Sequence, residues 1–205
     1  VTENTEVIVQ PLTFIATCNA VKYAGAYPVF VDVDLNTMGM CPKALRRFLE
    51  TETEEREGKR FNKKTNRLIS ACVPMHVFGH ACDIKEISKI CSEHNIPLIE
   101  DAAEAIGSYS DNKHLGTFGQ IGMLSFNGNK TITCGGGGAL ITDDESLAQK
   151  ARHLSTTARI REGFEFIHDA IGYNYRLTNV NAAIGCAQLE RLEEFIKVKR
   201  HMAKA

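Results

Sequence analysis

Apolar runs typical of β-strands recur along this chain, and most are followed by a turn and then by a stretch with helical periodicity. The runs lie at residues 6–10, 28–33, 67–73, 97–101, 121–126 and 139–142, and the helical stretches at residues 13–23, 42–50, 83–91, 144–154 and 178–202. This alternation predicts an α/β fold, a mostly parallel sheet with helices on both faces. The 205 residues, 43% of them hydrophobic, suffice for one domain with a buried core.

Local signals mark several of the expected helix ends. Gly25 follows the first helical stretch, where a helix C-terminus favours glycine. Pro42 stands in the first turn of the second stretch, and Asp83 is placed to cap the third. The highly charged residues 52–64 are expected to form a solvated loop or a frayed helix end.

Charge and hydropathy argue against two classes of partner. The net charge is −1, and no basic tract is longer than Lys63-Lys64 or Arg46-Arg47, so we expect no nucleic-acid partner. No apolar run approaches the roughly 18–20 residues that span a bilayer, and the N-terminus lacks a charged-then-apolar signal. We therefore expect a soluble, cytoplasmic protein with no membrane partner.

The seven cysteines are scattered and form no Cys-x-x-Cys pair, which argues against a disulfide framework or a zinc ribbon. The nearest approach to a metal cluster is His76, His80, Cys82 and Asp83, whose spacing fits helical metal ligands poorly. We expect no metal site.

Lys130 lies between two apolar runs and shortly before the four glycines Gly135–Gly138. This placement is typical of a buried amine, and burial favours the neutral, nucleophilic form of lysine. Such an amine can form a Schiff base.

Other reactive side chains also follow predicted strands. Asp101 ends the run 97–101, Ser125 precedes Lys130, and Thr13-Phe14 follows the first run. Ligands gather at the carboxyl ends of parallel strands, so we expect these groups to share one rim. A carboxylate, an amine, a hydroxyl and an aromatic ring are the set that pyridoxal phosphate needs.

Five segments carry a resemblance to a known family. They are Pro11–Thr17 (PLTFIAT), Pro28–Asp34 (PVFVDVD), Glu100–Ala105 (EDAAEA), Ser125–Lys130 (SFNGNK) and Gly172–Asn179 (GYNYRLTN). In order and spacing they resemble the DegT-like nucleotide-sugar aminotransferases, and the likeness spans nearly the whole chain. It implies the large domain of fold type I and the cofactor pyridoxal 5'-phosphate.

The resemblance implies a role for each site residue. Lys130 matches the Schiff-base lysine, Asp101 matches the partner of the pyridine nitrogen, Phe14 matches the stacking ring and Ser125 matches a phosphate ligand. Asn174 matches an asparagine that reaches the cofactor of a neighbouring subunit, which implies a homodimer. Glu104 stands where the family often has glutamine near the ring hydroxyl, and His76 matches a histidine near the substrate cleft. Simpler readings exist: Phe14 as a core residue, Asp101 as a turn cap, Ser125 as a backbone ligand, Asn174 as a turn residue and Lys130 as a surface lysine.

The implied reaction is amino transfer from an amino acid, expected to be glutamate, to a keto group of a nucleotide-linked sugar. The family's strand and Gly-Thr or Gly-Ser turn before Glu6, and its C-terminal small domain, are absent from this sequence. We therefore expect residues 1–205 to be most of a cofactor-binding large domain, cut from a longer enzyme. The alternatives are a non-catalytic domain of the same fold, a sugar dehydratase and a metal hydrolase using His76 and His80. A sugar dehydratase of this group has histidine in place of the lysine, so Lys130 disfavours it.

Overall fold

The computed structural model describes residues 1–160 and 164–205. Within it the chain forms two compact units, residues 1–124 and residues 125–205.

The first unit is built on a parallel sheet. Strand β1 (Glu6–Val9) lies between β2 (Tyr27–Phe30) and β5 (Ile69–Val73), and all three run in the same direction. Strand β6 (Ile99–Asp101) pairs in parallel with β9 (Ile121–Ser125). Parallel bridges from Cys72 to Leu98 and from Met75 to Asp101 join β5 to the β6 segment. The prediction of a mostly parallel sheet is thus confirmed for these five strands.

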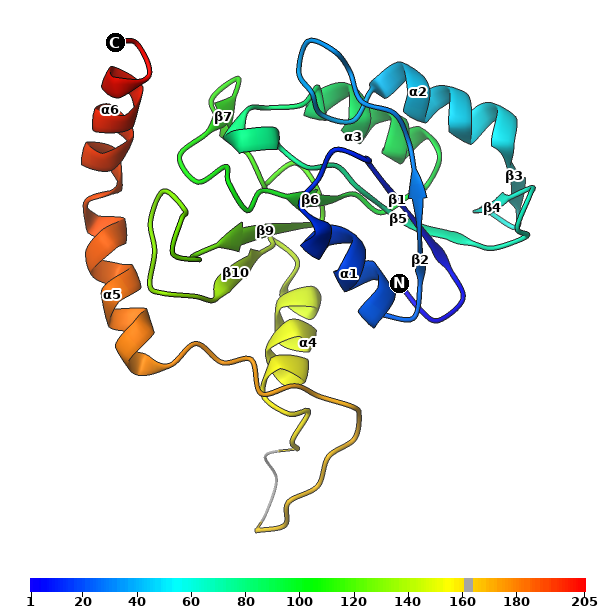
Figure 1. Ribbon diagram of the computed structural model, residues 1–205. Helices are drawn as coiled ribbons and strands as arrows, with labels where there is room; N and C mark the ends of the chain where they lie inside the picture. The colour runs from blue at the N-terminus through cyan, green and yellow to red at the C-terminus, as the bar shows by residue number, and fades with distance from the viewer. Residues whose placement is uncertain (161–163) are drawn as a thin grey trace. The chain divides into compact units, whose positions relative to one another are not determined.

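Helices cover both faces of this sheet (Figure 1). Helix α1 (Ile15–Tyr23) buries Cys18 and Val21 in a small core with β1 and β5. Helices α2 (Pro42–Arg47) and α3 (Ile84–Glu93) lie over the opposite face. The larger core there is aliphatic and sulfur-rich, and its fully buried members include Ile8, Met40, Leu45, Leu49, Cys72, Ile87 and Leu115.

The expected helix ends are confirmed. The side chain of Asp83 accepts the backbone N–H of Glu86 and caps α3. Gly25 has a φ of 74°, the left-handed conformation that ends a helix without strain. Pro42 is the first residue of α2.

The prediction of a loop or frayed helix for residues 52–64 is wrong. A π-helical turn, η1 (Phe48–Glu52), leads into an antiparallel hairpin of β3 (Thr53–Arg56) and β4 (Lys59–Asn62). Glu57 and Gly58, the two turn residues, both have positive φ, as a type I′ turn requires. The charged residues lie mostly on exposed positions of these strands, so the sequence pattern suggested a solvated loop and not paired strands.

A short 3₁₀ turn, η2 (Val77–Gly79), and a second hairpin, β7 (Tyr109–Ser110) with β8 (Lys113–His114), complete the elements of this unit.

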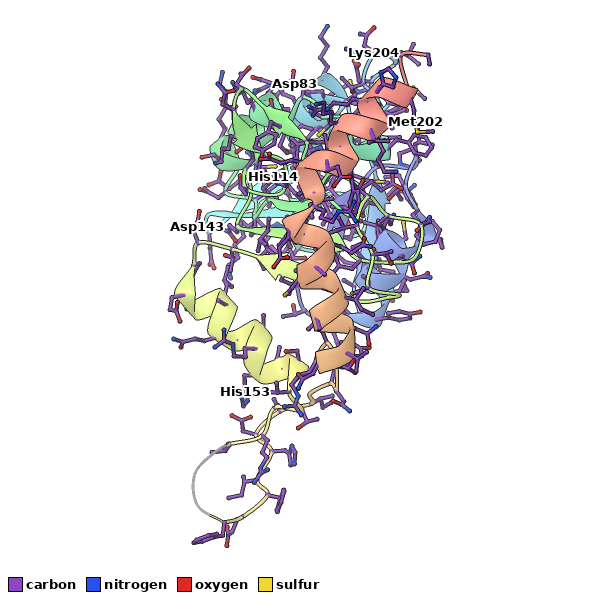
Figure 2. All side chains as sticks on the ribbon, turned by 90° about the vertical axis from the view of Figure 1, so that its left-hand side faces the viewer. Asp83, His114, Asp143, His153, Met202 and Lys204 are labelled. Carbon is purple, nitrogen blue, oxygen red and sulfur yellow. The ribbon has the colours of Figure 1, made fainter. Side chains whose placement is uncertain are left out.

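The second unit contains strand β10 (Gly138–Ile141) and helix α4 (Glu145–Ser155). Asp143 lies just before α4 and His153 lies in its last turn (Figure 2). Two further helices, α5 (Asn179–Glu190) and α6 (Leu192–Met202), replace the long helix predicted over residues 178–202. The prediction of an unbroken helix is wrong because Arg191, with φ −106° and ψ 10°, leaves helical geometry between them.

Candidate active site

Asp101, the last residue of β6, has a buried and well-held carboxylate. Its Oδ2 accepts the hydroxyl of Thr17 at 2.6 Å, and its Oδ1 accepts the backbone N–H of Ala103 at 3.2 Å. Only 7% of the residue is exposed. The structure thus places this acid at the carboxyl end of a parallel strand, and it shows the turn-capping contact to Ala103 as well.

Helix α1 supplies the support for this carboxylate. Thr13 and Thr17 share a hydrogen bond between their hydroxyls at 2.9 Å, so a short chain of hydroxyls leads to Asp101. Phe14 lies between the two threonines and is the N-cap residue of α1, and its carbonyl accepts the N–H of Thr17 at 3.1 Å. Its side chain is 70% exposed. The alternative that Phe14 is a core residue is therefore wrong for the described structure.

Glu104 lies three residues after Asp101 and is partly buried. Its carboxylate accepts the backbone N–H of Phe78 at 3.0 Å. Phe78 has a φ of 51°, which is costly for a bulky residue, and the residue is 81% exposed. The carboxylate of Glu104 therefore holds a turn that the sequence pattern did not predict.

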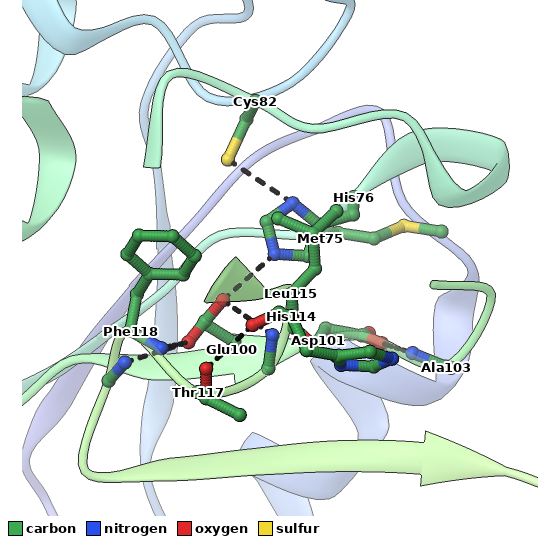
Figure 3. Close-up of polar contacts among 12 residues, drawn as sticks. Met75, His76, Cys82, Glu100, Asp101, Ala103, His114, Leu115, Thr117 and Phe118 are labelled. Atoms are coloured by element: carbon green, nitrogen blue, oxygen red, sulfur yellow. Dashed lines mark hydrogen bonds and ion pairs between the residues drawn. The ribbon is translucent and has the colours of Figure 1, made fainter. Parts of the chain in front are cut away.

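His76 is fully buried, and its imidazole lies among polar groups of the first unit (Figure 3). Its Nε2 lies 3.0 Å from Oε2 of Glu100, and its Nδ1 lies 3.6 Å from the sulfur of Cys82. Both ring nitrogens thus have partners inside the protein. This geometry favours a structural role for His76, while the contact with substrate stays a prediction.

Glu100, the neighbour of Asp101, was missed as a candidate although it is completely buried. Its Oε1 accepts the backbone N–H groups of Phe118 and Gly119, and its Oε2 accepts that of Gly116 as well as contacting His76. Burial opposes ionisation, but the hydrogen bonds from His76, Gly116 and Gly119 outweigh it and lower the pKa of this carboxyl. The sequence did contain one signal for Glu100, the pair Glu-Asp at the end of a strand. Because neighbours in a strand point to opposite faces, an acid next to Asp101 must have its own surroundings on the other face of the sheet.

Ser125 is the last residue of β9, and Lys130 follows it at the end of a short turn. The backbone N–H of Lys130 donates to the carbonyl of Asn127 at 3.0 Å, and Oγ of Ser125 accepts the N–H of Asn127 at 3.4 Å. Lys130 is partly exposed, so its expected burial is only partial in the described structure. The reason is local: Asn127 to Asn129, the turn before it, are all exposed.

Helix α5 braces the segment that follows Lys130. Gln188 accepts the backbone N–H of Thr133 at 3.0 Å, and the amide of Asn181 donates to the carbonyl of Cys134. The hydroxyl of Thr133 in turn donates to the carbonyl of Phe126 at 3.0 Å. Side chains of α5 therefore hold the chain after Lys130, and Thr133 ties that segment to Phe126, which precedes the lysine.

Asn174 is exposed and lies in an extended segment rather than in a turn. It forms an antiparallel bridge with Thr156, and the flanking rings of Tyr173 and Tyr175 stack with centroids 5.0 Å apart. The alternative that Asn174 is a turn residue is therefore wrong. Its reach toward a neighbouring subunit stays a prediction.

The residues present suit pyridoxal phosphate by the chemistry of their donors. Asp101 offers a fixed carboxylate that can accept the N–H of a protonated pyridine ring, and Phe14 offers an exposed aromatic face on the adjoining turn. Lys130 offers the only kind of side chain that both attaches a carbonyl cofactor and carries a proton. Among residues 1–160 and 164–205, no group of three or more His, Cys, Asp or Glu side chains could hold a metal ion. Within the same part of the chain, no helix is long and apolar enough to cross a membrane.

Comparison with known proteins agrees with the sequence motifs. The model of the DegT/DnrJ/EryC1/StrS aminotransferase family matches residues 1–205. A GDP-perosamine synthase of Escherichia coli O157:H7 is 41% identical over 99% of this chain and 51% of its own length. A Bacillus subtilis (strain 168) protein provisionally named a pyridoxal phosphate-dependent aminotransferase, EpsN, is 40% identical over 98% of this chain and 49% of its own. The chain thus spans about half the length of these relatives.

Solved structures show the same fold. An aminotransferase of this family from Brucella abortus superposes with a TM-score of 0.83 at 33% identity, over 95% of this chain and 49% of that one. The aminotransferase TlmJ from Streptoalloteichus hindustanus gives 0.85 at 32% identity, over 100% and 51% of the two chains. The fold is that of the pyridoxal phosphate-dependent aminotransferases of fold type I. This chain belongs to the DegT/DnrJ/EryC1/StrS aminotransferase family.

Proposed function

We propose that this chain carries the cofactor-binding residues of a pyridoxal phosphate-dependent aminotransferase. Its substrates would be an amino acid, glutamate as the expected donor, and a keto group of a nucleotide-linked sugar. The observation that carries the proposal is the buried carboxylate of Asp101, held by Thr17 three residues after the exposed Phe14, in a chain 41% identical to a GDP-perosamine synthase. We further propose a cytoplasmic homodimer whose two sites each use Asn174 of the neighbouring subunit.

Each residue would have a distinct task. Asp101 would accept the pyridine N–H and keep that nitrogen protonated, and Phe14 would cover one face of the ring. Ser125 would donate its hydroxyl to the phosphate, and Glu104 would lie near the ring hydroxyl, where its carboxylate can only accept a hydrogen bond. Lys130 would attach the cofactor and then carry the proton of the transfer step. When bound, pyridoxal phosphate supplies the electron sink that makes amino transfer possible.

Covalent trapping tests this proposal. The chain is mixed with pyridoxal phosphate, reduced with borohydride and digested, and its modified lysines are located by mass spectrometry. We expect the adduct on Lys130, at a pyridoxal phosphate concentration that leaves exposed lysines such as Lys89 unmodified. Lys130→Arg is the matched control because it keeps the charge but cannot form the adduct. Equal labelling of Lys130 and the surface lysines, or none, would indicate a non-catalytic domain of this fold.

A further inference from the structure

The two acids that end β6 face opposite sides of the sheet. Asp101 points toward α1, where Thr17 holds its carboxylate. Glu100 points toward the opposite face, where its carboxylate meets His76 and the backbone of residues 116–119 (Figure 3). Adjacent residues of a strand share a backbone, so whatever fixes one side chain also restricts its neighbour.

The carboxylate of Glu100 is saturated with hydrogen bonds. Its two oxygens receive three backbone N–H groups, from Gly116, Phe118 and Gly119, and lie against one imidazole nitrogen. A completely buried carboxylate with this many donors is an anion held in place by its surroundings. Losing one acceptor oxygen would leave a buried N–H without a partner.

Gly122 makes this arrangement possible. It is the register partner of Glu100 on β9, and a Cβ built on it would lie only 1.9 Å from the carbonyl oxygen of Gly116. The loop therefore crosses β9 where a side chain is missing, and this brings its amides onto Glu100. No other residue type permits so close an approach.

The thiol of Cys82 fixes the orientation of the imidazole. Burial and the nearby carboxylate of Glu100 raise the pKa of this thiol to about 12, so the sulfur keeps its proton. It can then donate to Nδ1 of His76, which leaves Nε2 to carry the ring proton and donate to Glu100. The assignment predicts that Nε2 rather than Nδ1 carries the ring proton in this contact.

The backbone of Asp101 is hydrogen-bonded to the segment that carries His76. Its N–H donates to the carbonyl of Pro74 at 2.9 Å, and its carbonyl accepts the N–H of His76 at 3.1 Å. His76 is therefore joined to this strand twice, by its backbone to Asp101 and by its side chain to Glu100. Movement of Glu100 would loosen both connections.

We propose that Glu100 is a positioning residue for Asp101: through His76 and the amides of residues 116–119, it fixes the strand end from which the Asp101 carboxylate meets the cofactor. The proposal deepens the function proposed above and rests on it for the role of Asp101. Glu100 itself touches no reacting atom in this scheme.

Glu100→Gln tests the proposal, since the amide keeps the shape but loses one acceptor oxygen. We expect its affinity for pyridoxal phosphate, measured by titration of the bound cofactor's absorbance, to fall about tenfold or more with a changed spectrum. Glu93→Gln removes the same charge from an exposed ion pair with Arg46 and should bind as the unaltered chain does. Unaltered affinity and spectrum in Glu100→Gln would overturn the proposal.

A pair of variants at His76 separates positioning from mere packing. His76→Gln retains an N–H that can reach Glu100, whereas His76→Leu has similar bulk and no donor. We expect His76→Gln to restore most of the affinity and spectrum that His76→Leu loses. Equal losses in both variants would indicate that the imidazole only fills space, and would count against the proposal.

Hydrogen exchange distinguishes failure of this proposal from failure of the proposed function, because it needs no cofactor. In Glu100→Gln we expect the amides of Asp101 and His76 to exchange more than about tenfold faster, while the amide of Val31, bonded to Val9, stays protected. If the unaltered chain binds no pyridoxal phosphate, the cofactor assignment fails while this exchange result still stands. Unchanged exchange at Asp101 and His76 would refute the positioning role of Glu100 in either case.

Discussion

Gly122→Ala is the sharpest test of how the loop of residues 116–119 reaches Glu100. The added Cβ would lie 1.9 Å from the carbonyl oxygen of Gly116 and 2.7 Å from its carbonyl carbon, whereas real Cβ contacts essentially never fall under 3.0 Å. The loop or the strand must therefore move by at least about 1.1 Å, and both partners are backbone with no rotamer to adjust. The N–H of Gly116, now 2.8 Å from Glu100, would lose its bond.

The cost follows from two contributions. Crowding in a packed interior costs about 1–3 kcal/mol, and a lost hydrogen bond to a charged group costs about 1.5–3 kcal/mol. We expect Gly122→Ala to lower the free energy of unfolding by about 3–5 kcal/mol, measured by urea unfolding followed by far-ultraviolet circular dichroism.

Gly58→Ala is the control within the same unit. Gly58 has a φ of 74°, and a Cβ there would meet no atom within 4 Å, so this variant reports only the cost of a side chain at positive φ, about 1–2 kcal/mol. If Gly122→Ala proves no more costly than Gly58→Ala, the loop is not held against Glu100 by the missing side chain, and the reasoning fails.

Three further changes test other parts of the structure. Thr17→Val removes the hydroxyl that donates to Asp101 and should cost about 1.5–3 kcal/mol by urea unfolding, while Thr17→Ser should retain most of it. Hydrogen bonds from Ser146 lower the pKa of the capping residue Asp144. The Asp144 carboxylate therefore stabilises α4 fully above the ordinary aspartate pKa, and this stabilisation is lost as pH falls through the lowered pKa of the folded protein. Asp144→Asn should flatten the acid-side decrease of the melting temperature, and an unaltered pH profile would refute the cap. Glu57→Asn should stabilise the hairpin by about 0.5–1 kcal/mol, because asparagine before Gly58 suits a type I′ turn, and a loss of stability would contradict that turn type.

Local rules predicted the parts of the fold that depend on one residue. Asp83 as a cap and Gly25 as a helix end follow from side-chain and backbone chemistry that needs no distant partner. The hairpin around Glu57 was missed because its charge density suggested a loop, although Glu57-Gly58 carried a turn signal. The break at Arg191 has no such signal, since every residue around it favours a helix.

In the candidate site, too, features that depend on one residue could be predicted, and features that depend on distant backbone could not. The placement of Asp101 at the carboxyl end of a parallel strand could be predicted, because the apolar run before it indicated that strand. The role of Glu100 could not, because three of its donors are backbone N–H groups in residues 116–119 and backbone amides leave no trace in a sequence. Residue type alone favours a buried Phe14, since a phenylalanine at a helix start is more often in the core, whereas the family resemblance implied a stacking ring; the residue is exposed.

The tandem of two acids at the end of β6 also restricts how this protein can evolve. Because successive side chains alternate between the sheet's faces, inserting or deleting one residue within 97–101 would exchange their destinations. Asp101 would then meet the amides of the crossing loop with too short a side chain, and Glu100 would crowd the threonine on α1. Length changes should therefore be tolerated in the exposed turns of the two hairpins and rejected in this five-residue segment.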